Sequence, residues 1–182
     1  MTAPASRRQK RDQAPSHDVG RSPLPIIDLT VESPLWTHAP GAAATVRRAI
    51  GEAAREIAKA QPAAGEVAVV LTDDAAIRAL NHRWRNLDAA TNVLSFPASG
   101  TFRRPGAPLG DIVIAYETAA REAAAECRPL GDHLAHLAVH GFLHLLGYDH
   151  ESDEAADAME GLERTILARL GVSDPYATHD AG

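Results

Sequence analysis

The order of apolar and polar positions along the chain predicts short strands early and helices that dominate towards the end. Ile26 and Val31 belong to a short apolar run of the kind found in strands. Val46, Ile50 and Ile57 recur near helical spacing in an alanine-rich stretch. By the same criteria, the predicted strands are residues 25–32, 66–71, 93–96 and 111–116, and the predicted helices are residues 42–60, 72–85, 117–127, 132–146 and 152–170. This order predicts an α/β or α+β domain, in which helices pack over a small mixed sheet of about four strands.

Residues that typically start or stop helices and strands support these predictions. Thr72 offers a hydroxyl that can cap a helix, and Asp73 and Asp74 then fall in the first turn, where the helix dipole favours acidic side chains. Pro97 is expected to stop the strand before it. Residues 98–109 hold glycine and proline breakers that are typical of a loop.

Length and composition indicate one domain with a tail at each end. The 182 residues fit a single domain, and 45% hydrophobic residues are enough to bury a sizeable core. Residues 1–22 are polar and lack any helical or strand period, so they are predicted to be a disordered tail. Their basic cluster could contact RNA, although a solvated tail is the favoured interpretation. The folded domain is expected to span residues 23–171, followed by a flexible tail at residues 172–182.

Cysteine content and hydropathy favour a cytoplasmic protein. Cys127 is the single cysteine, so no internal disulfide can form and a reducing compartment is expected. Its side chain is interpreted as a small buried one. No apolar run is long enough to cross a bilayer, and the first residues lack the apolar middle of a secretory signal. No membrane partner is therefore expected.

The charge pattern leaves room for a polyanionic partner at one place only. A formal net charge of −6 disfavours a general nucleic-acid binder, which is usually basic. Between residues 82 and 104, however, Arg83, Arg85, Arg103 and Arg104 stand against a single acid. Such a local basic patch can bind a polyanion on an acidic body. Aromatic residues make up only 4% of the chain, so no platform for stacking bases is expected.

Histidines form the most informative pattern. Five of the nine histidines lie between positions 133 and 150. His140 and His144 are four residues apart, so on a helix they lie on one face and can bind one ion. Gly147 then allows the helix to end in a left-handed conformation, and the turn can return His150 to the same ion. Three neutral imidazoles leave the fourth position of a tetrahedral zinc open, which is typical of a catalytic site. The alternative interpretation is a helix with scattered buried histidines and no metal site. His133, which lies outside the motif, is expected to face solvent.

One position separates this motif from that of the metalloproteases. The spacing of the three histidines and the glycine matches the long zinc motif of one protease group. Those proteases have a glutamate as general base directly after the first histidine, where this chain has Gly141. Zinc would still lower the pKa of a bound water towards neutrality. The pattern therefore indicates a metal hydrolase that lacks the protease base.

Three motifs resemble those of one family. The segment His140–His150 (HGFLHLLGYDH) resembles the hallmark motif of the YbeY-type endoribonucleases, which are bacterial rRNA maturation factors. Residues 85–97 (RNLDAATNVLSFP) and 109–112 (LGDI) resemble the second and third motifs of that family. The resemblance covers roughly residues 25–171, and the three motifs occur in the expected order.

The resemblance implies a fold, an activity and partners. It implies a single-domain α/β fold with one Zn²⁺ held at the positions of His140, His144 and His150, and a functional arginine at the position of Arg85. It further implies single-strand-directed RNA cleavage in 16S rRNA 3′-end maturation and ribosome quality control. The implied partners are the 16S rRNA precursor, the ribosome and ribosome-associated proteins. It leaves the oligomeric state open.

Arg85 has chemistry that suits this role. A guanidinium presents a planar fork of donors to a phosphate and can oppose the charge that builds up on a scissile phosphodiester. A surface salt bridge at a helix end is the alternative interpretation.

Other side chains are candidates for substrate contact or for support of the metal ligands. They are Asn92, Ser95, Asp111, His136 and Asp149. Asn92 and Ser95 flank a short strand that could line a groove, or they could be ordinary turn and strand residues. Asp111 could orient a ligand histidine or cap a strand edge. His136 could support a ligand or contact substrate, although a core histidine is favoured. Asp149 adjoins the third ligand and could help to move a proton.

Two other functions fit parts of the pattern. A metalloprotease-like peptidase is disfavoured by Gly141 in the position of the general base. A non-catalytic ribosome-associated module, in which zinc only stabilises the fold, is disfavoured by the open three-histidine site and by the local arginines.

Overall fold

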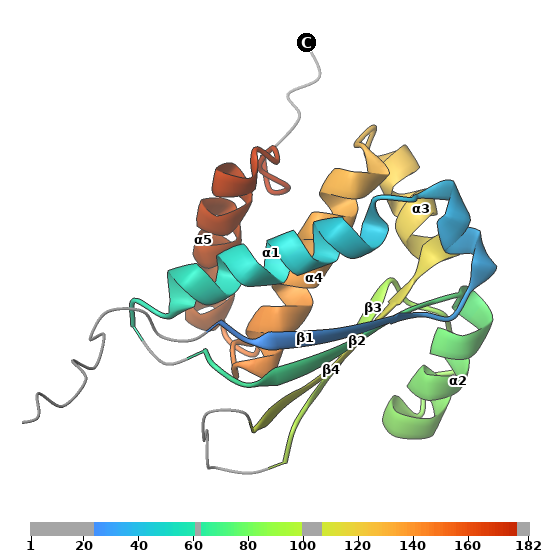
Figure 1. Cartoon of the computed structure of the whole chain (residues 1–182), viewed down its shortest axis with the longest axis horizontal. Helices are drawn as coiled ribbons and strands as arrows, with labels where there is room; N and C mark the ends of the chain where they lie inside the picture. Colours follow the sequence, from blue (N-terminus) through green and yellow to red (C-terminus); the bar gives the residue numbers. More distant parts are fainter. Residues whose placement is uncertain (1–23, 61–62, 100–106, 178–182) are drawn as a thin grey trace, which may run out of the picture.

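The computed structural model describes residues 24–60, 63–99 and 107–177. Within these ranges, four strands form one sheet, and five α-helices and a short 3-10 helix pack around it (Figure 1). The mixed α/β fold predicted from the sequence is confirmed. The tail predicted at residues 1–22 lies outside the described residues, as do the last residues of the predicted C-terminal tail, 178–182.

The sheet is mixed because its two last strands run antiparallel to each other. Its strands are β1 (Ile26–Val31), β2 (Glu66–Thr72), β3 (Val93–Pro97) and β4 (Pro108–Ala115), in the order β1-β2-β4-β3. β2 pairs in parallel with both β1 and β4, and β3 pairs antiparallel with β4. β3 is therefore an edge strand of the sheet.

The helices cover the two faces of the sheet unequally. They are the 3-10 helix η1 (Pro34–His38), α1 (Ala42–Ile57), α2 (Asp74–Arg85), α3 (Tyr116–Ala125), α4 (Leu130–Leu145) and α5 (Asp153–Leu170). α1 and α4 cover one face, with α3 and α5 packed against α4, whereas α2 lies on the other face (Figure 1). The helix that bears the three-histidine motif is therefore enclosed on several sides. Among the described residues, no helix is long and apolar enough to span a bilayer.

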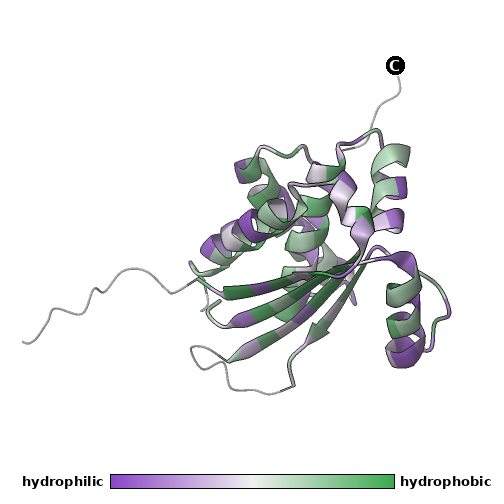
Figure 2. Cartoon of the chain, turned by 45° about the vertical axis from the view of Figure 1, so that its right-hand side comes forward, coloured by the Kyte–Doolittle hydropathy of each residue, from purple (hydrophilic) through white to green (hydrophobic). Residues whose placement is uncertain are grey.

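Alternation along the strands assigns each side chain to one face of the sheet. The strands are predominantly hydrophobic, and the hydrophilic residues lie mainly on the outer sides of the helices (Figure 2). In β4, Ile112 joins the main core under α1 and α4, whereas Val113 joins a small cluster under α2. The pairing of Ser95 with Ile112 places Ser95 on the α4 face. The pairing of Phe96 with Asp111 places both of these residues on the α2 face.

Two predicted boundaries between a strand and the helix that follows it are wrong. Thr72 still pairs with Ala115 as a strand residue, so it does not cap α2. The cap is Asp73, whose side chain accepts a hydrogen bond from the backbone N–H of Ala76 at 3.0 Å. Tyr116, predicted to end a strand, is the first residue of α3.

The structure also contains regular elements that the pattern did not predict. The helix η1 is too short to show a period, but it buries Trp36, whose Nε1 donates a hydrogen bond to the carbonyl oxygen of Thr72 at 2.8 Å. β4 begins at Pro108, inside the predicted loop, because Pro108 already pairs with Glu66. Both features depend on partners distant in the sequence.

Residues 172–177, which the sequence pattern assigns to a tail, contact the domain. Val172 is buried in the main core. A carboxylate oxygen of Asp174 lies 3.4 Å from Nε of Arg164. The hydroxyl of Tyr176 donates a hydrogen bond to Glu163 on α5. This segment therefore adds a side chain to the surroundings of the histidines.

Candidate metal centre

The end of α4 brings three histidines together. His140 and His144 lie one turn apart, and the helix ends after Leu145. Gly147 has a φ of 91°, which confirms the left-handed turn expected at this glycine. The turn returns the chain so that the ligand nitrogens of His140, His144 and His150 all lie within 4.8 Å of one another. The three rings predicted to form a site thus share one small volume.

Hydrogen bonds fix which nitrogen of each helical ring faces this volume. Nδ1 of His144 donates to the carbonyl oxygen of Tyr148 at 2.8 Å, and Nδ1 of His140 donates to a carboxylate oxygen of Glu163 at 2.8 Å. In the neutral form of each ring, Nε2 then carries a lone pair and no proton. The two Nε2 atoms lie 3.1 Å apart. Two lone pairs at this distance repel each other unless a cation lies between them, and the edge of a tetrahedral zinc site is about 3.3 Å for bonds of 2.0–2.1 Å.

The protonation state of His144 also suits a metal ligand. Burial lowers the pKa of His144, and the proximity of the His140 ring lowers it further. A lowered pKa favours the neutral imidazole, which is the form that binds a metal ion. His150 completes the group from outside the helix, and its ring stacks on that of His140 with centroids 5.2 Å apart.

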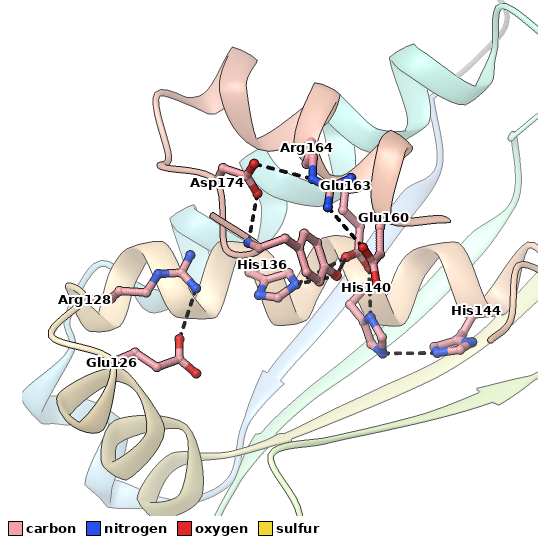
Figure 3. A network of polar contacts seen from close by, with 10 residues as sticks. Glu126, Arg128, His136, His140, His144, Glu160, Glu163, Arg164 and Asp174 are labelled. Carbon is pink, nitrogen blue, oxygen red and sulfur yellow. Dashed lines mark hydrogen bonds and ion pairs between the residues drawn. The ribbon is translucent and has the colours of Figure 1, made fainter. Parts of the chain in front are cut away.

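Glu163, which the sequence analysis did not single out, is the central group behind the histidines (Figure 3). Its side chain is 0% exposed, and one oxygen accepts the hydrogen bond from His140. The other oxygen contacts Nε2 of His136 at 3.3 Å and accepts a hydrogen bond from the Tyr176 hydroxyl. Burial raises the pKa of this carboxyl, but the hydrogen bonds from His136, His140 and Tyr176 lower it, and the outcome is a pKa of about 2. Glu163 is therefore a carboxylate that orients His140 through its Nδ1.

A signal for Glu163 was present in the helical pattern of α5. The buried residues of this helix are Met159, Glu163, Ile166 and Leu167, which share one face at helical spacing. A carboxylate on the apolar face of a helix must find buried partners, because an unpaired buried charge is strongly unfavourable. The acidic run between residues 151 and 163 masked this signal, since its other members are typical of a solvated surface.

Gly141 allows α4 to approach the sheet closely. A Cβ atom at this position would lie 3.0 Å from both Oγ of Ser95 and a methyl carbon of Ile112. The position where related proteases carry a general base thus points into packed sheet. A larger residue would fit only if Ser95 or Ile112 moved by a few tenths of an ångström, so the close packing here favours glycine over the glutamate of the proteases.

Two further candidates lie beside the centre. His136 contacts Glu163, and its ring lies edge-on to that of His140 with centroids 6.2 Å apart. His136, His140 and Glu163 form a second set of groups close enough to hold a metal ion. Asn92 donates a hydrogen bond to Glu122 at 2.9 Å. A cavity of about 400 Å³ is lined by both residues together with His133, His140 and Tyr176, among others. Space for part of a substrate therefore exists directly beside His140.

The prediction that His133 faces solvent is wrong. Its ring is 4% exposed, and its Nε2 lies 2.9 Å from a carboxylate oxygen of Glu122. The same oxygen accepts the hydrogen bond from Asn92. This half-buried acid belongs to α3, so the sequence alone does not show that it is the partner of His133. The prediction that Cys127 is buried is also wrong, because it follows the end of α3 and is exposed.

The remaining candidates lie at different places. Ser95 faces α4 and lies beneath Gly141, close to the centre. Asp111 is exposed on the α2 face, on the other side of the sheet from the histidines. Asp149 accepts a hydrogen bond from the backbone N–H of Glu151 at 3.1 Å, and so stabilises the turn that carries His150. The structure brings Ser95 towards the histidines and separates Asp111 from them.

Arg85 stands apart from the histidines in the fold. It is the last residue of α2, which lies on the opposite face of the sheet from α4, and it is exposed. Among the described residues, its guanidinium has no ion-pair partner, so the salt bridge considered as an alternative does not form there. Asn86 follows in a left-handed conformation, with φ of 58°, and ends the helix.

Comparisons with known proteins give one consistent family. A family model described as endoribonuclease YbeY matches residues 37–171. A protein named endoribonuclease YbeY from Bradyrhizobium diazoefficiens is 50% identical to this chain over an alignment that covers 97% of each chain. Another of this name, from a Rhodopseudomonas palustris strain, is 55% identical over 161 residues, which cover 86% of this chain and 92% of that relative. The region matched by the family model includes all three histidines and Glu163.

Proposed function

Because this chain belongs to the endoribonuclease YbeY family, we propose that it is a zinc-dependent, single-strand-specific endoribonuclease of the cytoplasm. Its proposed substrate is the 16S rRNA precursor, and its proposed roles are maturation of the 3′ end and quality control of the ribosome. We further propose that the ribosome and ribosome-associated proteins are its partners.

The observation that carries the proposal is the group of His140, His144 and His150 with Glu163 behind it. Two Nε2 lone pairs face each other because both Nδ1 protons are engaged elsewhere. Three imidazoles are a ligand set that suits zinc and leaves a position open for water. When bound, the metal would supply an acidified water and neutralise charge on the phosphodiester. His140, held by a carboxylate, would be the most electron-donating of the three ligands.

Gly141 argues against the peptidase alternative. In peptidases with this histidine spacing, the residue after the first histidine accepts a proton from water. Here that residue has no side chain, and the space that one would need is taken by Ser95 and Ile112. The general base of a peptidase is thus missing from its usual position.

The test is RNA cleavage by metal-loaded and metal-stripped protein. We expect the loaded protein to cleave single-stranded RNA, the stripped protein to be inactive, and added Zn²⁺ to restore cleavage. A duplex of the same sequence should be cut much more slowly, and a denatured protein substrate should stay intact. Equal cleavage by stripped and loaded protein would contradict metal dependence, and proteolysis without RNA cleavage would support the peptidase.

Arg85→Glu is expected to abolish most of the RNA cleavage while zinc content and folding stay unchanged. A carboxylate there repels a phosphate of the bound RNA and removes the proposed phosphate contact, so we expect cleavage at limiting RNA to fall by roughly 10-fold or more. Arg85→Lys should recover only part of the activity, because a point charge cannot reproduce a two-pronged contact. Arg48→Glu is the matched control, since Arg48 is an exposed arginine on α1. Wild-type cleavage by Arg85→Glu would show that this arginine does not contact the substrate.

A further inference from the structure

Trp84 is an unusual surface residue. It lies in the last turn of α2 and is 63% exposed, although tryptophan is the side chain with the largest apolar surface to bury. The other tryptophan, Trp36, is 3% exposed and hydrogen-bonded in the core. Leu87, just past the helix, is also exposed, at 57%. An exposed apolar surface of this kind commonly marks a binding site.

The exposed ring is held in place and surrounded by positive charge. Its centroid lies 6.2 Å from that of Phe96, at an interplanar angle of 61°, so the ring packs against β3. The guanidinium carbon of Arg83 lies 5.3 Å from the Trp84 ring centroid, and Arg85 is the next residue along the chain. The nearby acid Asp88 is already bound by Arg78 through two hydrogen bonds, at 2.7 and 2.8 Å.

The position of Phe96 relates this surface to the metal centre. Phe96 faces α2, whereas its neighbour Ser95 faces α4 and lies beneath Gly141, next to His140. Both residues belong to β3, which is an edge strand. A flexible single strand of RNA that crosses this edge of the sheet would therefore meet Trp84 on one face and the histidines on the other.

We propose that Trp84 stacks on an unpaired base of the RNA substrate, with Arg83 and Arg85 contacting the flanking phosphates. The proposal rests on the proposed function and adds to it a site for the substrate away from the metal. An aromatic ring beside arginines is the usual means of binding single strands, because every base has a face to stack and every nucleotide a phosphate. Among the described residues, neither Arg83 nor Arg85 forms an ion pair, so both guanidinium groups are available to phosphates, which favours RNA over a protein partner. Stacking also requires an unpaired base, which would contribute to single-strand preference.

Tryptophan fluorescence gives a direct test. The metal-loaded protein is mixed in a stopped-flow instrument with a ten-nucleotide single-stranded RNA, and emission is followed before cleavage. We expect saturable quenching in the wild type and none in Trp84→Phe, which retains only the buried Trp36. Trp84→Ala should bind the RNA on the order of 10-fold more weakly, whereas Trp84→Phe should bind within a few-fold of the wild type because its ring still stacks. Zinc content confirms that both variants retain the metal centre.

Leu87→Ala is the matched control. It removes a second exposed apolar side chain near the same helix end but no aromatic face, and should leave RNA binding unchanged. If the wild type cleaves RNA but shows no quenching, and Trp84→Ala binds equally well, the stacking proposal is overturned while the proposed function stands. That result would favour a protein, and not RNA, as the partner that binds the surface around Trp84. If the wild type is quenched by RNA but does not cleave it, the proposed function fails and the stacking site remains.

Discussion

His144→Ala is expected to release most of the bound metal and to abolish RNA cleavage. Three protein ligands are the minimum for a tight catalytic zinc site, so the loss of one leaves two histidines and solvent. Because zinc sites with a full set of ligands bind with about 10–16 kcal/mol, we expect the affinity to fall by roughly 100-fold or more. The measurements are zinc per chain by elemental analysis and the dissociation constant by competition with a chelator. Full zinc occupancy in the variant at limiting zinc would show that His144 is not a ligand.

A second variant decides between two overlapping groups of potential ligands. His140 belongs both to the three-histidine group and to the group of His136, His140 and Glu163. We expect His136→Ala to retain metal, because Nδ1 of His140 donates its proton to Glu163 and only Nε2 remains free to bind an ion. His38→Ala, at an exposed histidine of η1, serves as the control. If His136→Ala loses the metal and His144→Ala retains it, the ion binds to His136, His140 and Glu163 instead.

The local part of the metal centre could be predicted from the sequence. The four-residue spacing of His140 and His144, and the glycine after them, depend only on helix geometry and on the conformational freedom of Gly147. Both features belong to one short segment, so they can be predicted without knowledge of distant contacts. The mixed sheet and most helices could be predicted for the same reason, because apolar period is a local signal.

The rest of the site depends on distant contacts. Glu163 meets His140 across 23 positions of sequence, and Tyr176 reaches Glu163 from a segment beyond the last helix. Composition also cannot show which side chains are exposed. The low aromatic content predicted no stacking platform, but it does not exclude a single exposed ring such as that of Trp84. His133 was assigned to solvent because its partner, Glu122, lies on another helix. Polar side chains are the hardest to place, since the same residue is stable in water or beside a buried partner.

Glu163→Gln is expected to lower metal affinity while the protein stays folded. Glutamine keeps an acceptor oxygen for Nδ1 of His140, but it has no negative charge to strengthen this hydrogen bond or to balance the charge of a bound metal ion. We expect the affinity for zinc to fall by about 10–100-fold, as for other carboxylates that orient a metal-binding histidine. Bound Co²⁺ should show a changed visible spectrum, which a merely structural residue would not alter. Glu163→Ala should in addition destabilise the fold by roughly 3–5 kcal/mol, because it leaves buried partners uncompensated.

The acid stability of the metal-free protein provides an independent test of the same carboxylate. The pKa of Glu163 is about 2 in the folded protein and 4.5 ordinarily, so the charge stabilises the fold above pH 4.5, and this stabilisation is lost as the pH falls towards 2. Glu163→Gln binds no proton there, so its free energy of unfolding should fall less than that of the wild type across this range. Glu160→Gln, one turn earlier on α5 at an acid paired with Arg164, is the matched control and should follow the wild type in metal affinity. Parallel stability curves for the wild type and Glu163→Gln would show that the charge of Glu163 does not stabilise the fold. Equal zinc affinities would show that this carboxylate does not strengthen metal binding by His140.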